Sequence, residues 1–250
     1  MIRASVYIVA LNEEANIARA LESVKEFEDI VVIDSGSVDK TKELSSAYTD
    51  NIIYNEWINE FQQRDFALSQ CQFDWVLSLD ADEEISPELL AHIRKTVESD
   101  KVDGLDINIR EYFMGKLPGK GVKLTHRVKF FRKSKFNYGE ARVHIPQFVD
   151  GKVVKAKGYI THFGAKSVEL AVMKNNKYSS LSARDKFEKN KRPSRLKIVF
   201  IFPIVFFKYY LLKRHCLSGI RGFVLSINCA HYALLKEAKL YELDQEDSHD

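Results

Sequence analysis

Apolar and polar positions alternate in two distinct patterns over the first hundred residues. Short apolar runs that are typical of buried strands occur four times, at Ala4–Leu11, Asp29–Asp34, Asn51–Tyr54 and Asp74–Leu79. Segments with helical spacing follow them, at Glu14–Val24, Asp39–Ala47, Glu60–Gln70 and Pro87–Asp100. Ser86 directly before Pro87 is a helix N-cap signal. Four β-α units in succession predict a parallel sheet with helices on both faces.

The pattern changes after residue 100. Shorter β-like segments occur at Gly104–Ile109, Val128–Arg132 and Arg142–Val149, and they predict a mixed sheet that continues the first one. From Ser167 onward the chain reads as helical. We therefore expect an α/β domain over residues 1–165 and a helical extension over 166–250.

Composition narrows the class of protein. The chain has 250 residues, of which 45% are hydrophobic and 29% charged, and this balance excludes a disordered or disulfide-stapled chain. Its three cysteines lie far apart, which excludes a C-x-x-C pair and fits a reducing cytosol. The polar segment 12–14 interrupts the first apolar run too early for a signal peptide.

Charge is unevenly distributed along the chain. Residues 1–100 carry 8 Lys+Arg against 21 Asp+Glu, whereas residues 101–230 carry 28 against 8. A basic segment of this kind predicts an anionic partner, such as a phospholipid headgroup, a phosphorylated substrate or nucleic acid. Nucleic acid is disfavoured because the sequence has no groove-reading motif.

Acidic residues gather where the fourth predicted strand ends. Asp80 and Asp82 form a D-x-D motif, with Glu83 and Glu84 directly after it. Crowded carboxylates favour a bound cation, and Mg²⁺ or Mn²⁺ prefers oxygen ligands. The alternative is a solvated loop in front of a helix N-terminus. In parallel sheets, ligands bind beyond the carboxyl ends of the strands, where this motif falls.

The C-terminal part contains an unusual apolar run. Ile198–Phe207 consists of ten apolar residues flanked by Arg195, Lys197 and Lys208. Ten residues are too few to span a bilayer, and Pro203 interrupts the helix. The pattern favours shallow insertion into an anionic membrane interface. The alternative is burial against the first domain or against a partner subunit.

Longer motifs resemble a known family. The segments VYIVALNEEANIARALESV, IVVIDSGSVDKT and DWVLSLDADEEISPEL are similar to the signatures of family 2 glycosyltransferases, which have the GT-A fold. The resemblance continues through FQQRDFAL and through EYFMG, HRVKFFRK, ARVH and THF. This longer pattern resembles bacterial β-1,4-glucosyltransferases of the lipopolysaccharide core. It implies a Rossmann-like, mostly parallel mixed sheet between helices.

The resemblance implies roles for individual residues. Those implied at the nucleotide-sugar are Ala10, Asn12, Glu13, Asp34, Ser35, Gly36, Arg64 and Asp80. Among them, Asp34 would bind the uracil edge and Asp80 the ribose or sugar side. Asp82 and His162 would ligate Mn²⁺ or Mg²⁺ at the diphosphate.

The implied reaction is an inverting, single-displacement transfer of a hexose. UDP-glucose is the first expectation for the donor, ahead of UDP-galactose and a UDP-N-acetylhexosamine. The acceptor would be an inner-core heptose of lipopolysaccharide, or another lipid-linked or polysaccharide acceptor, at the inner face of the cytoplasmic membrane. The sequence leaves the oligomeric state open.

Two positions depart from the family pattern. Relatives have a glutamate where this chain has Ile145, so Glu140 and His144 are the local candidates for the general base. Gln62 stands where many relatives have a lysine. The departure at Ile145 leaves open a further interpretation, in which the chain binds a nucleotide-sugar without turning it over.

Overall fold

The computed structural model describes residues 1–138, 147–165 and 167–247, and the chain divides into two compact units. The sheet unit contains residues 1–110 together with the described residues of 125–164. The helical unit contains residues 111–124 and the described residues from 165 onward. The sequence analysis placed residues 111–124 in the first domain.

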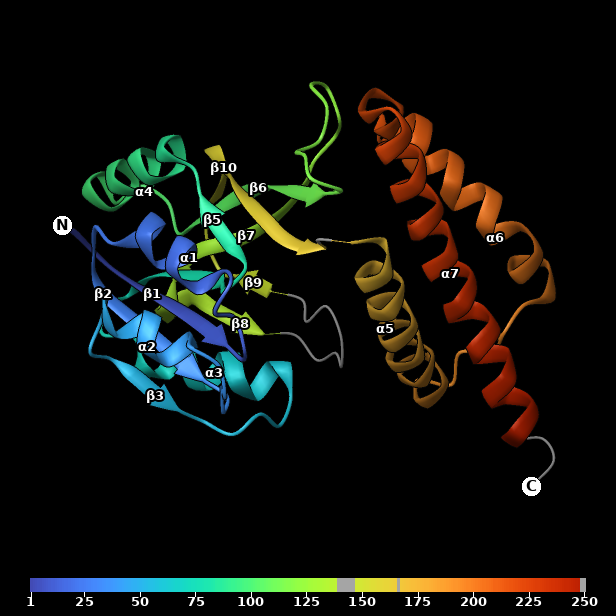
Figure 1. Ribbon diagram of the computed structural model, residues 1–250, viewed down its shortest axis with the longest axis horizontal. Helices are drawn as coiled ribbons and strands as arrows, with labels where there is room; N and C mark the ends of the chain where they lie inside the picture. Colours follow the sequence, from blue (N-terminus) through green and yellow to red (C-terminus); the bar gives the residue numbers. More distant parts are fainter. Residues whose placement is uncertain (139–146, 166, 248–250) are drawn as a thin grey trace. The chain divides into compact units, whose positions relative to one another are not determined.

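The sheet unit is built on one eight-stranded mixed sheet (Figure 1). Its strands are β1 (Ile2–Ala10), β2 (Phe27–Asp34), β3 (Ile52–Tyr54), β4 (Trp75–Asp80), β5 (Glu83–Ile85), β6 (Gly104–Phe113), β7 (Thr125–Arg132) and β10 (Val153–Ala165). They lie in the order β3-β2-β1-β4-β7-β6-β10-β5. The first four strands are parallel, and β7 pairs antiparallel with both β4 and β6. The predicted α/β class with a mixed sheet is confirmed.

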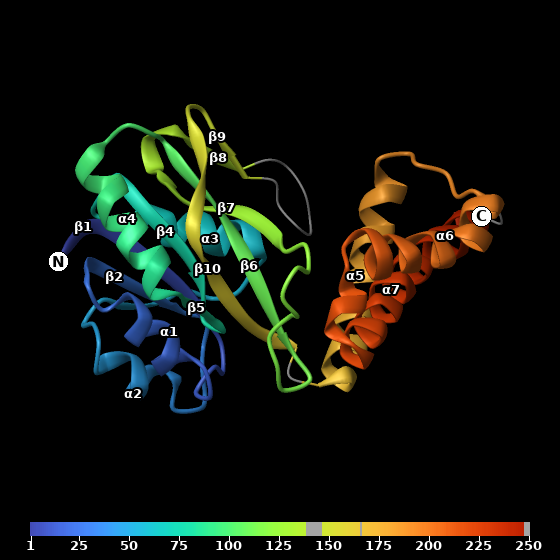
Figure 2. The same cartoon turned by 90° about the horizontal axis from the view of Figure 1, so that it is seen from above.

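Helices cover both faces of this sheet, as predicted (Figure 2). They are α1 (Ile17–Val24), α2 (Thr41–Ser46), α3 (Glu60–Gln70) and α4 (Pro87–Ser99). On one face, Val6 of β1 belongs to the same buried cluster as Leu21 of α1 and Ile93 of α4. On the other face, Tyr7 clusters with Ala67 of α3. Successive strand residues therefore supply two cores, because side chains alternate across a sheet.

Two details of the sheet unit differ from the sequence analysis. Glu83 and Glu84 do not lie in a loop: they belong to β5, which pairs antiparallel with β10 and places His162 opposite Glu83. The predicted strand Arg142–Val149 is described only over β9 (Gln147–Val149), which pairs with β8 (Phe136–Tyr138) in a separate two-stranded sheet. Ser86 does cap α4, because its hydroxyl accepts from the Leu89 amide at 3.2 Å.

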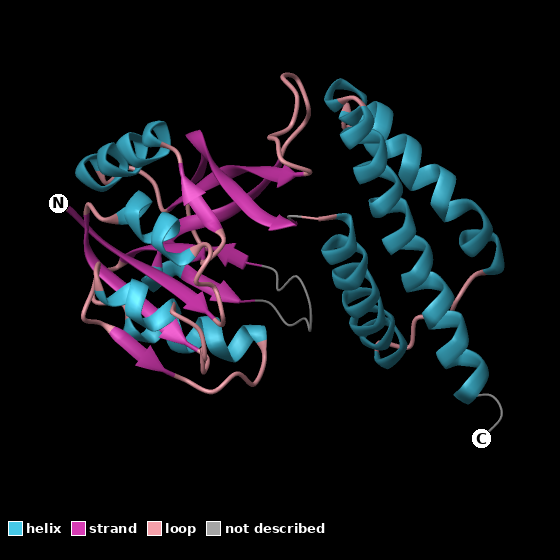
Figure 3. Ribbon diagram, in the orientation of Figure 1, coloured by secondary structure: helices cyan, strands magenta, loops and turns pink. Residues whose placement is uncertain are grey.

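The helical unit contains α5 (Val168–Glu188), α6 (Arg195–Phe207), a π-helical turn (Lys208–Leu212), a 3₁₀ turn (His215–Ser218) and α7 (Ile220–Asp247) (Figure 3). Both α5 and α6 pack against α7. Residues 111–124 join this unit through Gly119, whose amide donates to the Ser218 hydroxyl at 2.9 Å. None of the helices in the described part of the chain is both long and apolar enough to cross a bilayer.

Candidate active site

The carboxyl ends of three neighbouring parallel strands lie side by side. The strand register pairs Ala10 of β1 with Asp34 of β2, and Val9 of β1 with Asp80 of β4. Three of the residues predicted at the nucleotide-sugar are therefore brought to one edge of the sheet. This edge is where α/β proteins bind ligands.

The loops that follow β1 and β2 are joined by hydrogen bonds. The Asn12 amide donates to the Ser37 hydroxyl, and the Asn12 side-chain oxygen accepts from the Val38 amide, both at 3.0 Å. Asn12 itself has a φ of 55°, a left-handed conformation that asparagine tolerates better than most residues. The Glu13 amide donates to the Thr41 hydroxyl at 2.8 Å. Asn12 and Glu13 therefore help to fix the shape of this edge.

Asp34 is nearly inaccessible, and its carboxylate shapes the turn after β2. The carboxylate accepts from the amides of Gly36 at 3.1 Å and of Ser37 at 3.2 Å, and the residue is 1% exposed. Gly36 has a φ of 100°, which a glycine adopts without strain. The Ser35 hydroxyl accepts from the Gln63 side chain at 2.9 Å. The predicted contact of Asp34 with a uracil edge stays a prediction.

Asp80 lies between two cationic side chains of the protein. The Arg64 guanidinium donates to its Oδ1 at 2.7 Å, and the Lys129 ammonium donates to its Oδ2 at 3.0 Å. Lys129 also bonds Glu83, and these two side chains are 3% and 4% exposed. Burial raises the pKa of Asp80, but Arg64 and then Lys129 outweigh it and hold that pKa well below its usual range. Asp80 is therefore a fixed anion.

This network corrects one step of the sequence argument. Crowded carboxylates were expected to favour a bound metal ion, but the cations that compensate Asp80 and Glu83 belong to the chain itself. Arg64 binds Asp80 and also donates to the Ser78 hydroxyl at 3.1 Å, and its contact with the nucleotide-sugar stays a prediction. The sequence analysis missed Lys129. Its signal was a single lysine between apolar residues in a predicted strand.

Asp82 lies beside His162. The two side chains approach to 3.4 Å between Oδ2 and Nε2, and both are partly exposed. The Phe163 amide donates to the Asp82 carbonyl at 2.8 Å and so ties β10 to the D-x-D turn. A Cβ atom on Gly164 would lie 2.4 Å from His162 Nε2 and 2.9 Å from Asp82 Oδ2. A side chain at position 164 would therefore displace at least one of these two groups.

The Asp82–His162 pair fits the donor set of a divalent ion. Neighbouring ligand atoms on one octahedral Mg²⁺ lie roughly 3 Å apart, because each lies about 2.1 Å from the metal. Among the described residues, no group of three or more His, Cys, Asp or Glu side chains could hold a metal. Two protein ligands are enough when substrate phosphates supply others.

The two candidates for the general base, Glu140 and His144, lie outside the described residues. Gln62, which replaces the lysine of many relatives, accepts a hydrogen bond through Oε1 from the Asn59 side chain at 2.8 Å, at the N-terminus of α3.

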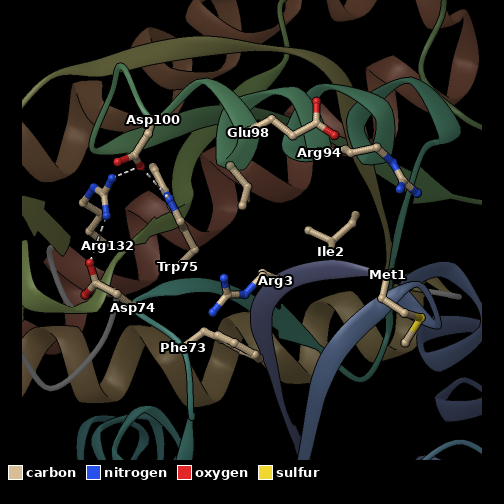
Figure 4. A pocket seen from close by; sticks show the side chains of 11 residues that line it. Met1, Ile2, Arg3, Phe73, Asp74, Trp75, Arg94, Glu98, Asp100 and Arg132 are labelled. Carbon is tan, nitrogen blue, oxygen red and sulfur yellow. Dashed lines mark hydrogen bonds and ion pairs between the residues drawn. The ribbon is translucent and has the colours of Figure 1, made fainter.

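A cavity of about 520 Å³ lies at the opposite edge of the sheet, where β1 and β4 begin (Figure 4). Three of its charged side chains are paired with one another, and Arg94 pairs with Glu26 outside the cavity. Arg132 bonds Asp74 at 3.1 Å, bonds Asp100, and lies over the Trp75 ring with its guanidinium carbon 4.6 Å from the centroid. Arg132 therefore holds two of the carboxylates that line this cavity.

The mixed sheet, with its polar parallel-strand ends and its D-x-D turn, defines a GT-A fold. The chain belongs to the family described as glycosyl transferase family 2, whose profile matches residues 5–153. It is 33% identical over 253 residues to the lipopolysaccharide core biosynthesis glycosyltransferase LpsC of Rhizobium meliloti (strain 1021), covering 95% of this chain and 92% of that protein.

Other similar proteins carry less specific names or are more distant. An uncharacterized glycosyltransferase, RT0209 of Rickettsia typhi, is 31% identical over 257 residues, covering 97% of this chain and 88% of that protein. Among solved structures, S. aureus TarS 1–349 in complex with UDP is similar, with a TM-score of 0.49 and 17% identity, covering 99% of this chain and 91% of that chain.

Proposed function

We propose that this protein is an inverting, metal-dependent hexosyltransferase. The donor is a UDP-sugar, with UDP-glucose as the first choice, and the acceptor is an inner-core heptose of lipopolysaccharide or a similar lipid-linked glycan. The observation that carries the proposal is the Asp82–His162 pair at the strand-end edge of a family 2 chain. The acceptor class is supported by the 33% identity to LpsC.

Different residues at this edge would bind the metal and the sugar part of the donor. Asp82 and His162 would hold Mn²⁺ or Mg²⁺ at the diphosphate of the donor. The metal would offset the negative charge that builds on the departing diphosphate. Asp80, kept ionised and fixed by Arg64 and Lys129, would accept a further hydrogen bond from a ribose or sugar hydroxyl.

Proton transfer and acceptor binding involve other parts of the chain. Glu140 or His144 would take the proton from the acceptor hydroxyl. The basic residues after position 100 would contact acceptor phosphates and the inner face of the cytoplasmic membrane, where we place the protein as a peripheral enzyme. Ile145, where relatives have a glutamate, favours a second candidate function, the binding of a nucleotide-sugar without turnover.

The first experiment is titration calorimetry with UDP and a panel of UDP-sugars, with and without Mn²⁺. We expect metal-dependent binding and a preference for one sugar, which would name the donor. Transfer to a heptose-containing core acceptor, assayed by release of UDP, separates the enzyme from the non-catalytic binding protein. Absence of binding to every UDP-sugar tested would contradict both candidates.

Asp82→Asn tests the site assignment, because it keeps the side chain's shape and removes its charge. We expect the metal-dependent affinity for UDP to fall at least about tenfold, which corresponds to about 1.4 kcal/mol. Asp106→Asn is the matched control, since Asp106 also lies beside a histidine, 2.7 Å from His126 Nδ1. Equal, small effects of the two substitutions would remove Asp82 from the metal site.

A further inference from the structure

Helix α6 has a large apolar face that the rest of the helical unit does not cover. Its members follow each other at helical spacing and continue into the π-helical turn, and each is between 54% and 73% exposed. They are Leu196, Val199, Phe200, Ile204, Phe207 and Leu211, which we call the α6 apolar face. Contiguous exposed apolar patches of this kind mark interaction sites in soluble proteins.

The opposite side of α6 already supplies the packing that the helical unit needs. Phe206 meets Phe223 of α7 edge-to-face, with ring centroids 5.5 Å apart. Tyr210 in the π-helical turn meets the same ring at 5.8 Å. Because the inner side of α6 faces α7, the outer face has no evident role in holding these two helices together (Figure 1). A helix that is apolar on all sides requires a second apolar environment.

The sequence around this face is rich in cations, although Lys197 and Arg192 pair with Glu237 and Asp244 of α7. Residues 189–236 contain ten Lys+Arg and no Asp or Glu. Arg195 lies at the start of α6, and Lys208 and Arg214 follow its end, and all three are exposed. Cations at both ends of an exposed apolar stripe match an interface in which hydrocarbon lies beneath anionic headgroups.

We propose that the α6 apolar face inserts into the headgroup region of an anionic lipid bilayer, with the helix lying in the membrane plane. A second copy of the chain is a poorer occupant, because a symmetric contact through α6 would bring two sets of these cations together. The inference rests on the proposed function, in which the acceptor is lipid-linked, and deepens it. It adds how the chain reaches such an acceptor, which is by lying on the membrane surface.

The test is co-sedimentation of the full chain with vesicles of phosphatidylcholine containing about 30% phosphatidylglycerol, compared with phosphatidylcholine alone. We expect binding to the anionic vesicles and at least about tenfold weaker partitioning for Phe200→Glu combined with Ile204→Glu. The matched control is Val172→Glu with Met173→Glu on α5, which makes the same change at exposed apolar residues elsewhere in the helical unit. This control should bind as the wild type does.

Insertion itself is measured with a tryptophan at position 200. In Phe200→Trp, brominated lipid should quench the added emission, whereas it should leave Met173→Trp unquenched. Equal loss of binding in the α6 variant and the α5 control would overturn the proposal. So would a dimer that forms without lipid and that the α6 substitutions dissociate. Neither assay contains UDP or acceptor, so a failure of the proposed function leaves the vesicle result interpretable.

Discussion

Replacing Lys129 by Met tests whether a buried cation holds the D-x-D strand end together. The substitution removes the charge while keeping a similar side-chain volume. It leaves Glu83, 4% exposed, as a buried carboxylate without its partner, while Asp80 keeps Arg64. Removal of one partner from a buried ion pair costs about 3–5 kcal/mol of unfolding free energy. We expect a loss of this size in the stability of the sheet unit.

The measurement is urea unfolding followed by tryptophan emission. The chain has two tryptophans, Trp57 and Trp75, and both belong to the sheet unit, so the signal reports that unit alone. The control is Lys135→Met, which removes a lysine that is 46% exposed and lies 2.9 Å from Asp103. A surface ion pair contributes about 0–1 kcal/mol, so this variant should unfold almost as the wild type does.

Adding Glu83→Gln to Lys129→Met separates the charge effect from a packing effect. The Asp80 amide donates to Glu83 at 3.0 Å, and the amide oxygen of Gln can still accept this hydrogen bond. The substitution also removes the negative charge that has lost its lysine partner. The double variant should therefore be more stable than Lys129→Met alone. A Lys129→Met protein within about 1 kcal/mol of the control, or a double variant no more stable than the single one, would refute the reasoning.

The stability deficit of Lys129→Met should also depend on pH. Burial raises the pKa of Glu83 in the wild type despite the attraction of Lys129, and loss of that lysine raises it further. A carboxyl group whose pKa is higher in the folded state takes up a proton on folding, so it disfavours folding increasingly as pH rises. The deficit should therefore shrink as pH is lowered from 8 towards about 5.

Two further predictions concern other parts of the chain. Gly164→Ala should weaken Mn²⁺-dependent UDP binding at least about tenfold while leaving urea unfolding nearly unchanged, because the new Cβ displaces the His162 ring rather than the backbone; unaltered calorimetry would contradict this. Burial raises the pKa of Cys71 and of Cys229 to about 12, so brief alkylation at pH 8 should label Cys216 first, and peptide mass spectrometry showing early labelling of Cys71 would contradict this.

The sequence predicts the parallel half of the sheet well because its signals are local. The apolar run Ala4–Leu11 is strand Ile2–Ala10 in the structure, and the helix predicted over Glu60–Gln70 has the same bounds in the structure. A buried strand is recognised from its apolar run and the polar turns beside it, and a helix from its spacing and its caps. All of these signals lie in neighbouring residues. The same locality places Asp34 and Asp80 at strand ends.

Features that depend on distant parts of the chain could not be predicted in this way. Strand β5 has only three residues and forms by pairing with β10. Three residues are too few to show an alternation of apolar and polar positions, so the sequence pattern does not predict this strand. Lys129 reaches Asp80 across 49 positions of sequence. Residues 111–124 pack with helices that begin after residue 165, and the composition of that segment contains nothing that favours either unit.

The two carboxylates of the D-x-D motif differ in what surrounds them. Both oxygens of Asp80 accept from cations of the chain, Oδ1 from Arg64 and Oδ2 from Lys129, and a metal at Asp80 would have to compete with both. Asp82 lies beyond the strand end and faces His162, a side chain that ligates metals when neutral. Two positions along the chain thus separate a fixed anion from a candidate ligand. The difference comes from strands outside the motif, because β7 supplies Lys129 and β10 supplies His162.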